Sequence, residues 1–304
     1  MKRVIAGVSV GVIVLVLVPV LVWYFGFTCR WTRSFSSKIH CRCSGYSPPP
    51  DAPLRVDADC NKIAEAFTKA VASKDPEHIG AGDYQPLMEL VNQQNFPCDK
   101  VFFWSKTHEL ALSYQGELHT LNKMFVGHIA DGLMWCPDES SSEVKYGPYR
   151  EKNGICPMGP TQIFWKVASK WFAKNACKKV RVLLNGSNKE SVAYNGSSVF
   201  ASVEVRNLPS AVTALHACVI RDSEARDSCS GASIKQLESD LRRYVRQDIT
   251  FTCEHTDRKS FPACLNRGVS QCKSVLWGSG VIGLILAFLL SINLPDSGAT
   301  LVGS

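Results

Sequence analysis

The sequence predicts a two-lobed protein of the α+β/α/β class, with a helical N-terminal lobe and a small, mainly parallel α/β C-terminal lobe. Helical periodicity dominates the first half of the 304-residue chain, and short apolar runs alternate with helices in the second half. Such alternation is typical of a parallel sheet with helices on its faces. The 13 cysteines indicate a fold stapled by disulfides in an oxidising compartment.

The elements of the first half follow from proline content and apolar spacing. Residues 29–56 contain four prolines and predict a stalk or entry loop. We expect a strand at Lys100–Trp104 and a loop over Asp138–Gly159. Apolar spacing predicts helices over Asp59–Ser73, Asp83–Asn92, Lys106–Gln115, Thr120–Met134 and Pro160–Ala176, the last with a core stripe of Phe164, Val167, Ala168 and Trp171.

The second half contains short β-type runs around one amphipathic helix. The helix is expected over Ile234–Val245, where apolar residues recur at helical spacing. Strands are predicted at Val180–Leu184, Val199–Val205, Leu215–Ile220 and Ile249–Cys253.

Both ends of the chain carry apolar runs. The run from Val4 to Phe27 is long enough to span a bilayer, so residues 1–28 are a signal-anchor or a long cleaved signal peptide. The run at 275–294 is either a lipid-anchor signal or a second membrane span. Either way, the region between the two runs enters the secretory pathway. The sequons at Asn185 and Asn195 fit glycosylation in that compartment.

Composition excludes several classes of protein. A net charge of +7 without a block of like charges gives no indication of nucleic-acid binding. Neither Cys-x-x-Cys pairs nor Cys/His ligand spacings are present, so we expect no metal. The sequence also lacks a phosphate-binding loop and a nucleophile elbow.

A few residues stand out as candidates for chemistry, each beside a plainer explanation. Trp165 and Ser169 share a helix face outside the core stripe and could line a cleft, or Trp165 could simply be covered by a loop. Glu204 shares a strand face with Phe200, where an exposed carboxylate is the alternative. Trp104 by itself is typical of a core residue. The residues alone thus indicate a secreted or surface disulfide-rich α/β protein with an aromatic cleft.

A set of ordered motifs extends this interpretation, because together they resemble the ADP-ribosyl cyclase/NAD glycohydrolase family. The similarity runs from about Cys43 to Cys272. The motifs are Phe103-Trp104-Ser105, Thr120-Leu121, Ala130-Asp131 with Trp135-Cys136, Phe164-Trp165-Lys166 with Ser169, Leu184-Asn185-Gly186-Ser187, and Phe200 with Ser202-Val203-Glu204-Val205. Several separated matches in the same order are far more specific than any one of them.

The resemblance implies a membrane-attached ectoenzyme with its catalytic domain at 38–272, on the cell surface or in a vesicle lumen. The helical lobe would be about 38–97 plus 120–176, and the sheet lobe about 98–119 plus 177–272, with the active-site cleft between them. NAD or NADP would be substrate rather than cofactor. Nucleic acid is not expected as a partner, and the sequence leaves the oligomeric state open, a homodimer included.

The resemblance also implies roles for single residues. Glu204 aligns with the catalytic glutamate, and Trp104 and Trp165 with the two aromatic walls. Nicotinamide leaves NAD as a neutral molecule and needs no general acid, so one carboxylate near the ribose is enough to stabilise or trap the oxocarbenium-like state. The expected substrate contacts are Ser169, Asp131, Asn122, Leu121, Ser105, Lys106 and Phe200.

Two departures from the family pattern bear on activity. The family usually carries a glutamate, which influences cyclisation against hydrolysis, at the position of Asn122. Because Asn122 lacks the charge, we expect retained NAD cleavage with more cyclisation. Lys106 stands where the family often has arginine, which keeps the charge but loses the bidentate fork. A catalytically weak receptor or adhesion ectodomain with the same fold is the alternative function.

The family disulfides carry over by resemblance as Cys43–Cys60, Cys98–Cys177, Cys229–Cys253 and Cys264–Cys272. Two further cysteines, Cys136 and Cys156, have lost their family partners, and we expect them to pair with each other. Cys29–Cys41 is expected as a stalk bond or an interchain link, and Cys218 as a free buried thiol.

Overall fold

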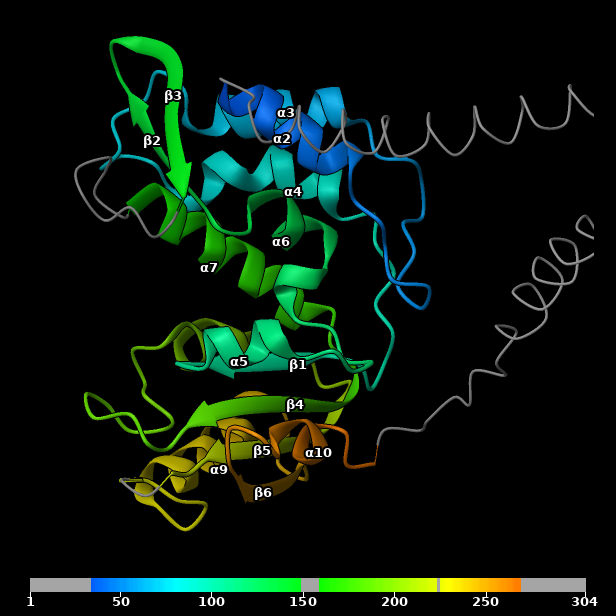
Figure 1. The fold of residues 1–304 in the computed structure, drawn as a ribbon, viewed down its shortest axis with the longest axis vertical. Coiled ribbons are helices and arrows are strands. Elements are labelled where there is room, and N and C mark those ends of the chain that lie inside the picture. Colours follow the sequence, from blue (N-terminus) through cyan, green and yellow to red (C-terminus); the bar gives the residue numbers. More distant parts are fainter. Residues whose placement is uncertain (1–33, 149–158, 223–224, 269–304) are drawn as a thin grey trace, which may run out of the picture. The chain divides into compact units, whose positions relative to one another are not determined.

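The computed structural model describes residues 34–148, 159–222 and 225–268. The apolar runs at 4–27 and 275–294 lie outside these residues. Within the described part of the chain, no helix is long and apolar enough to cross a membrane. Up to Arg267 the described residues belong to one compact unit, in which a group of helices lies beside a four-stranded sheet (Figure 1).

The helical lobe is organised around an aromatic core. The Phe67 and Phe164 rings stack at 5.0 Å, and the Trp135 ring meets them edge-on at 5.0 and 5.3 Å. Trp135 Nε1 donates a hydrogen bond to the Tyr84 hydroxyl at 3.1 Å, which donates to a carbonyl of α7 at 2.9 Å. The lobe is built from α2 (Phe35–Ser44), α3 (Cys60–Val71), η1 (Ala81–Tyr84), α4 (Gln85–Val91), η2 (Leu121–Lys123), α6 (Phe125–Ala130) and α7 (Gly159–Lys174).

Two segments that we expected to be irregular are regular instead. The predicted stalk contains α2, which begins at the Ser34 cap and buries Phe35 and Ile39, four residues apart. The predicted loop contains β3 (Ser141–Pro148), which pairs antiparallel with β2 (Leu133–Asp138). The Tyr146 ring of β3 lies 5.9 Å from the Phe35 ring of α2. The hairpin and α2 therefore stabilise each other through tertiary packing, which the local sequence does not indicate.

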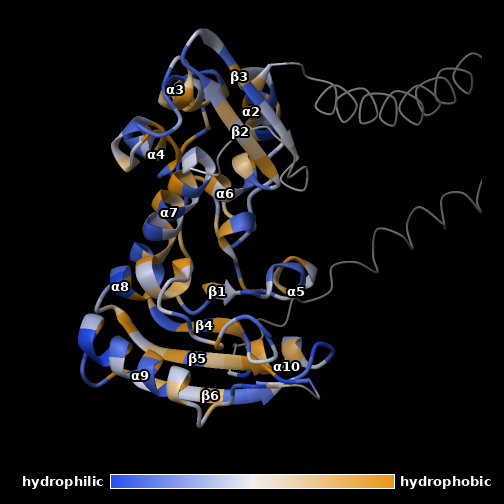
Figure 2. Ribbon diagram, turned by 90° about the vertical axis from the view of Figure 1, so that its left-hand side faces the viewer, coloured by the Kyte–Doolittle hydropathy of each residue, from blue (hydrophilic) through white to orange (hydrophobic). Residues whose placement is uncertain are grey.

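The sheet lobe confirms the prediction of a parallel sheet. The strand order is β1-β4-β5-β6, and every neighbouring pair is parallel. Helices α9 and α10 lie against the sheet (Figure 2). The elements are β1 (Phe102–Ser105), α5 (His108–Ser113), β4 (Lys178–Asn185), α8 (Val205–Asn207), β5 (Val212–Ile220), α9 (Ala232–Tyr244), β6 (Thr250–Thr256) and α10 (Phe261–Leu265).

The strand predicted at Val199–Val205 is wrong. The segment forms η3 (Phe200–Glu204), a π-helical turn that continues into α8. The cause is tertiary packing. Phe200 and Glu204 are four residues apart, so a helical turn buries both on the same side. A strand here would have needed a neighbouring strand to satisfy its backbone hydrogen bonds. The Phe200 ring lies 5.9 Å from the Phe103 ring and 6.0 Å from the Tyr194 ring.

The disulfides confirm three expected pairs and correct a fourth. Cys43–Cys60, Cys98–Cys177 and Cys229–Cys253 form as expected. Cys264, however, pairs with Cys218 rather than with Cys272, so the expected free thiol at Cys218 is wrong. Since α10 packs on β5, the two residues lie within bonding distance, with Cα atoms 6.1 Å apart. Cys41 and Cys136 are also disulfide-bonded. Their expected partners, Cys29 and Cys156, lie outside the described residues.

Candidate active site

Three elements meet at the candidate site: the turn η3, the helix α7 and the strand β1. Phe103 of β1 joins them, since its ring lies 5.3 Å from Phe172 of α7 and 5.9 Å from Phe200 of η3. The residues that follow Phe103, Trp104 and Ser105, end the strand at its carboxyl end. Open parallel sheets bind their ligands at this end.

Glu204 is the most unusual residue of the site, because it is a carboxyl group in the protein interior. Its exposed fraction is 7%. Burial raises the pKa of Glu204 from its ordinary 4.5 to about 8, and a hydrogen bond with the Ser169 side chain lowers the pKa in part. The alternative of an exposed strand carboxylate is therefore wrong, since η3 turns Glu204 inward. A buried carboxyl group with a raised pKa is a typical feature of catalytic sites.

Helix α7 supplies Ser169 and Trp165. The two residues are four apart and share a helix face, as the sequence analysis expected. Ser169 is 5% exposed and Trp165 is half-buried against the Phe164 ring at 5.3 Å. The buried stripe of α7 lies closer to this face than the sequence predicted. Phe164 and Ala168 are buried, whereas Val167 and Trp171 are only partly buried.

A second cluster lies at the carboxyl end of α6. Asn122 Nδ2 donates a hydrogen bond to Asp131 Oδ1. The Arg42 guanidinium of α2 donates to the Asp131 backbone carbonyl, and its charge also acts on the Asp131 side chain. Because α2 was not expected, Arg42 escaped the sequence analysis. The sequence did carry a signal for this helix: a serine cap, apolar residues at helical spacing, and the basic Arg42 in the last turn.

The amide at position 122 has a direct electrostatic consequence. A glutamate in its place would bring a second carboxylate to Asp131, and two carboxylates at that distance share a proton. Asn122 instead donates a hydrogen bond and leaves Asp131 as the lone carboxylate of the pair. Lys123, the next residue, is directed elsewhere, since its ammonium group donates to the Tyr114 carbonyl and lies 5.2 Å from the Tyr114 ring.

The end of β1 and the loop after it carry the remaining candidates. The Trp104 ring is half-buried and lies 5.1 Å from the His108 ring of α5. Ser105 is buried, whereas Lys106 is exposed and adopts a left-handed backbone conformation with φ of 58°. The Lys106 carbonyl accepts a hydrogen bond from Asn185 Nδ2 at 3.2 Å, which joins the ends of β1 and β4.

The structure therefore brings the candidates together in groups. Glu204 joins Ser169, and Asn122 joins Asp131. Leu121 is buried in η2, which packs on α7, while Phe200 is fully buried and acts as a core residue beneath Glu204. Among the described residues, the Trp104 and Trp165 rings each contact another aromatic residue and not one another.

These features define a class of protein: a two-lobed, disulfide-linked fold with a buried glutamate between a small parallel sheet and a tryptophan-bearing helix. A family model described as ADP-ribosyl cyclase matches residues 32–273. The chain belongs to the ADP-ribosyl cyclase family.

Individual relatives agree with this assignment. ADP-ribosyl cyclase/cyclic ADP-ribose hydrolase 1 of the rabbit (Oryctolagus cuniculus) is 40% identical over 283 residues, which cover 88% of this chain and 92% of the relative. A structure of porcine CD38 complexed with a covalent intermediate, ribo-F-ribose-5'-phosphate, is 41% identical with a TM-score of 0.62, covering 74% of this chain and 97% of that one. A structure of Aplysia cyclase with the substrate NGD and the product cGDPR is 27% identical with a TM-score of 0.66, covering 78% and 94%.

Proposed function

We propose that this protein cleaves the nicotinamide–ribose bond of NAD and releases cyclic ADP-ribose and ADP-ribose. The buried Glu204, hydrogen-bonded to Ser169, is the observation that carries the proposal. The relatives support it, since a covalent intermediate is bound in the porcine structure and a substrate and product in the Aplysia structure.

The chemistry needs one ionised carboxylate at the reacting ribose. When the bond to the nicotinamide nitrogen breaks, its electron pair leaves with nicotinamide and positive charge develops on the ribose. The Glu204 carboxylate lies in the protein interior, where it stabilises such a charge far more strongly than in water. The same oxygen can close onto the ribose carbon as a transient ester, which a second nucleophile then displaces.

The product depends on which nucleophile reaches the intermediate. Water gives ADP-ribose, the adenine of the same molecule gives cyclic ADP-ribose, and another pyridine base gives exchange, which on NADP with nicotinic acid yields nicotinic acid adenine dinucleotide phosphate. Trp104 and Trp165 would hold the flat rings by stacking and exclude water. Asp131, held by Asn122 and Arg42, would act on the base.

We also propose where the protein works. The disulfides among the described residues require an oxidising compartment, which supports a catalytic domain on the extracellular or luminal side of a membrane. Attachment through 4–27, through 275–294, or through a lipid added after cleavage near the latter is part of this proposal, as is glycosylation at Asn185 and Asn195.

The test is to incubate the purified full-length protein with NAD and to separate the products by chromatography. We expect free nicotinamide from the wild type and none above background from Glu204→Gln, which keeps the shape but lacks the charge. Ser202→Ala, an exposed neighbour on η3, is the matched control and should cleave normally. If a folded, disulfide-intact wild type left NAD untouched, the proposal would be overturned in favour of a receptor or adhesion role.

A further inference from the structure

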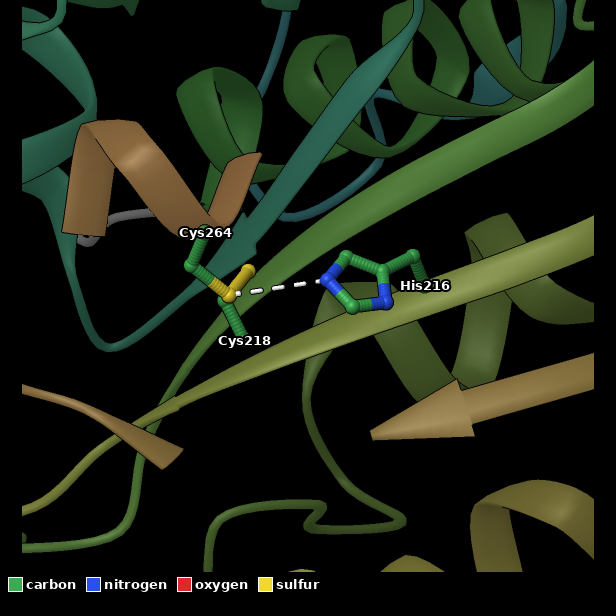
Figure 3. Close-up of side chains that lie close together, drawn as sticks. All are labelled: His216, Cys218 and Cys264. Carbon is green, nitrogen blue, oxygen red and sulfur yellow. Dashed lines mark hydrogen bonds between the residues drawn. A yellow bond between two sulfur atoms is a disulfide. The ribbon is translucent and has the colours of Figure 1, made fainter. Parts of the chain in front are cut away.

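A buried histidine and two cysteines meet on the face of the sheet that carries α10, and none of them belongs to the candidate active site. His216 and Cys218 lie on β5 and Cys264 on α10 (Figure 3). Their exposed fractions are 4%, 0% and 2%. The cysteines form a disulfide, and His216 Nε2 lies 3.6 Å from Cys264 Sγ.

The surroundings of His216 are those of a metal ligand. Its Nδ1 lies 2.8 Å from Thr252 Oγ1, which orients the ring and leaves Nε2 facing the sulfurs. Metal-binding histidines are held in this way through their second nitrogen. Glu254 Oε2 lies 3.9 Å from Nε2, and Glu254 stands directly opposite Cys218 in the β5–β6 register. The two sulfurs and the imidazole nitrogen thus lie within 4.8 Å of one another, and Glu254, whose other oxygen is paired with Arg267 at 2.7 Å, stands beside the histidine.

The distances fit a tetrahedral zinc ion once the disulfide is open. With zinc bonds of about 2.0 Å to nitrogen and 2.3 Å to sulfur, neighbouring N and S ligands are ~3.5 Å apart. The 3.6 Å between His216 Nε2 and Cys264 Sγ already has this value. Two thiolates on one zinc are ~3.8 Å apart, which is close to the contact distance that two sulfurs reach when the covalent bond between them breaks.

The charges nearby favour thiolates over a neutral disulfide. The charges of Lys179, Arg181 and Arg267 act on His216. Arg181 lies opposite His216 in the β4–β5 register, is fully buried, and has no hydrogen-bond partner for Nε or Nη2 within the described residues. Arg267 is paired with Glu254 at 2.7 Å, so Arg181 is the charge that bears on the cluster, and positive charge stabilises ionised sulfur.

We propose that reduction of the Cys218–Cys264 disulfide converts this cluster into a zinc site with Cys218, Cys264 and His216 as ligands, and with Glu254, once it has left Arg267, as the fourth. An external dithiol supplies two electrons and two protons to the disulfide and becomes a disulfide itself. Zinc then displaces the two thiol protons. The zinc ion would replace the covalent bond as the link between α10 and β5, so that α10 stays packed on the sheet in a reducing environment.

Cobalt(II) is the probe for the test, because tetrahedral thiolate ligation gives it intense visible absorption. The purified full-length protein is reduced with a dithiol, freed of reductant without air, and titrated with cobalt. We expect these bands from the reduced wild type and not from the oxidised wild type or from Cys218→Ser/Cys264→Ser. The matched control is Cys229→Ser/Cys253→Ser, which leaves the proposed ligands in place and should keep the bands. The reduced Cys229 and Cys253 are not expected to bind cobalt together with the nearby His255, because His255 Nε2 accepts a hydrogen bond from the Cys229 backbone N–H at 2.8 Å.

A second variant leaves every cysteine and ligand in place. Thr252→Val removes only the partner of His216 Nδ1 and should weaken cobalt binding about 10- to 100-fold. Thr250→Val, two residues along the same face of β6, should leave the affinity unchanged. Zinc should also raise the unfolding temperature of the reduced protein and not of the oxidised protein. Bands that survive in Cys218→Ser/Cys264→Ser, absence of bands in the reduced wild type, or equal affinity in Thr252→Val would each overturn the proposal.

Discussion

Glu204 holds a carboxyl group where water cannot solvate its charge. Burial raises its pKa to about 8, so the group is largely protonated in the free protein near neutral pH. In the proposed function, a cationic nicotinamide ring bound next to Glu204 would favour the ionised form, because opposite charges in the interior attract strongly. Substrate binding and ionisation of Glu204 would then be coupled, so that the carboxylate forms where positive charge develops on the ribose.

This coupling predicts a pH dependence. The free enzyme's Glu204 must lose its proton to act, so kcat/KM for NAD should rise with pH and level off above an apparent pKa of about 8. Ser169→Ala removes the hydrogen bond that lowers this pKa and should move the midpoint upward. Initial rates measured across the pH range give the midpoint, with Ser202→Ala as the control. A midpoint that stays in place in Ser169→Ala would contradict the assignment.

Asn122 predicts a change in products rather than in overall rate. Asn122→Glu places a second carboxylate beside Asp131 and should shift the products from cyclic ADP-ribose toward ADP-ribose. The expected change in product ratio is ~10-fold, equivalent to about 1.4 kcal/mol between the competing barriers. Chromatography of the products measures the ratio, and Asn122→Gln, which keeps the amide, is the control. An unchanged ratio in Asn122→Glu would remove Asn122 from the determinants of cyclisation.

At the scale of elements, η3 decides the site. The alternating pattern of Val199–Val205 is typical of a strand, yet the segment is helical because Phe200 has a buried place between Phe103 and Tyr194. The turn puts Phe200 and Glu204 on the same buried face and leaves Ser202 exposed. The Glu204 carboxyl group is thus held in the interior by an aromatic ring one turn away.

The stability of η3 should therefore affect catalysis. Phe200→Ala creates a cavity and should lower the free energy of unfolding by about 3–5 kcal/mol. It should also lower kcat, because Glu204 loses its fixed position, while Phe200→Leu should recover part of both. Denaturant unfolding and steady-state kinetics measure the two effects. Phe96→Ala, which removes a ring packed against Trp171 and Phe172, should change stability with little effect on kcat.

At the scale of the whole molecule, the chain enters the sheet lobe from the helical lobe twice, before β1 and before β4. Cys98–Cys177 joins these two entry points, and Asp99 Oδ1 accepts a hydrogen bond from the Lys179 backbone at 2.8 Å beside it. The bond spans a sequence separation of 79, whereas Cys43–Cys60 spans 17 within the helical lobe. The long link thus fixes the relative position of β1 and β4, which carry the loops at the candidate site.

The two disulfides should differ in their effect on stability. In the chain-entropy account, the longer loop stabilises more, by about 1.4 kcal/mol for these two separations. Replacing Cys98 and Cys177 by alanine should therefore lower the denaturant midpoint more than replacing Cys43 and Cys60. Cys229–Cys253, with a separation of 24, is the intermediate case. Equal midpoints for the three double variants would show that native-state strain outweighs loop entropy here.

Much of this architecture was predictable because it depends on short-range pattern. Helix α3 begins at the Asp59 cap and buries the face that its apolar spacing marked, and the strands β1, β4, β5 and β6 lie where apolar runs predicted them. The elements that escaped prediction, α2, the β2–β3 hairpin and η3, have sequences whose local preference is weak or misleading. Their form comes from partners distant in the chain, such as Phe35 for Tyr146 and Phe103 for Phe200.

The same division holds for the sites. Ordered motifs identified Glu204, Trp165 and Ser169 as candidates and the family to which the chain belongs, since motif order survives without coordinates. Only the tertiary structure decided which side of its element Glu204 faces and that Arg42 reaches Asp131. It also decided that Cys264 pairs with Cys218 rather than with Cys272. The reason is physical: burial and disulfide pairing depend on distances in space, and residues separated by 46 positions come together only when a helix packs on a strand.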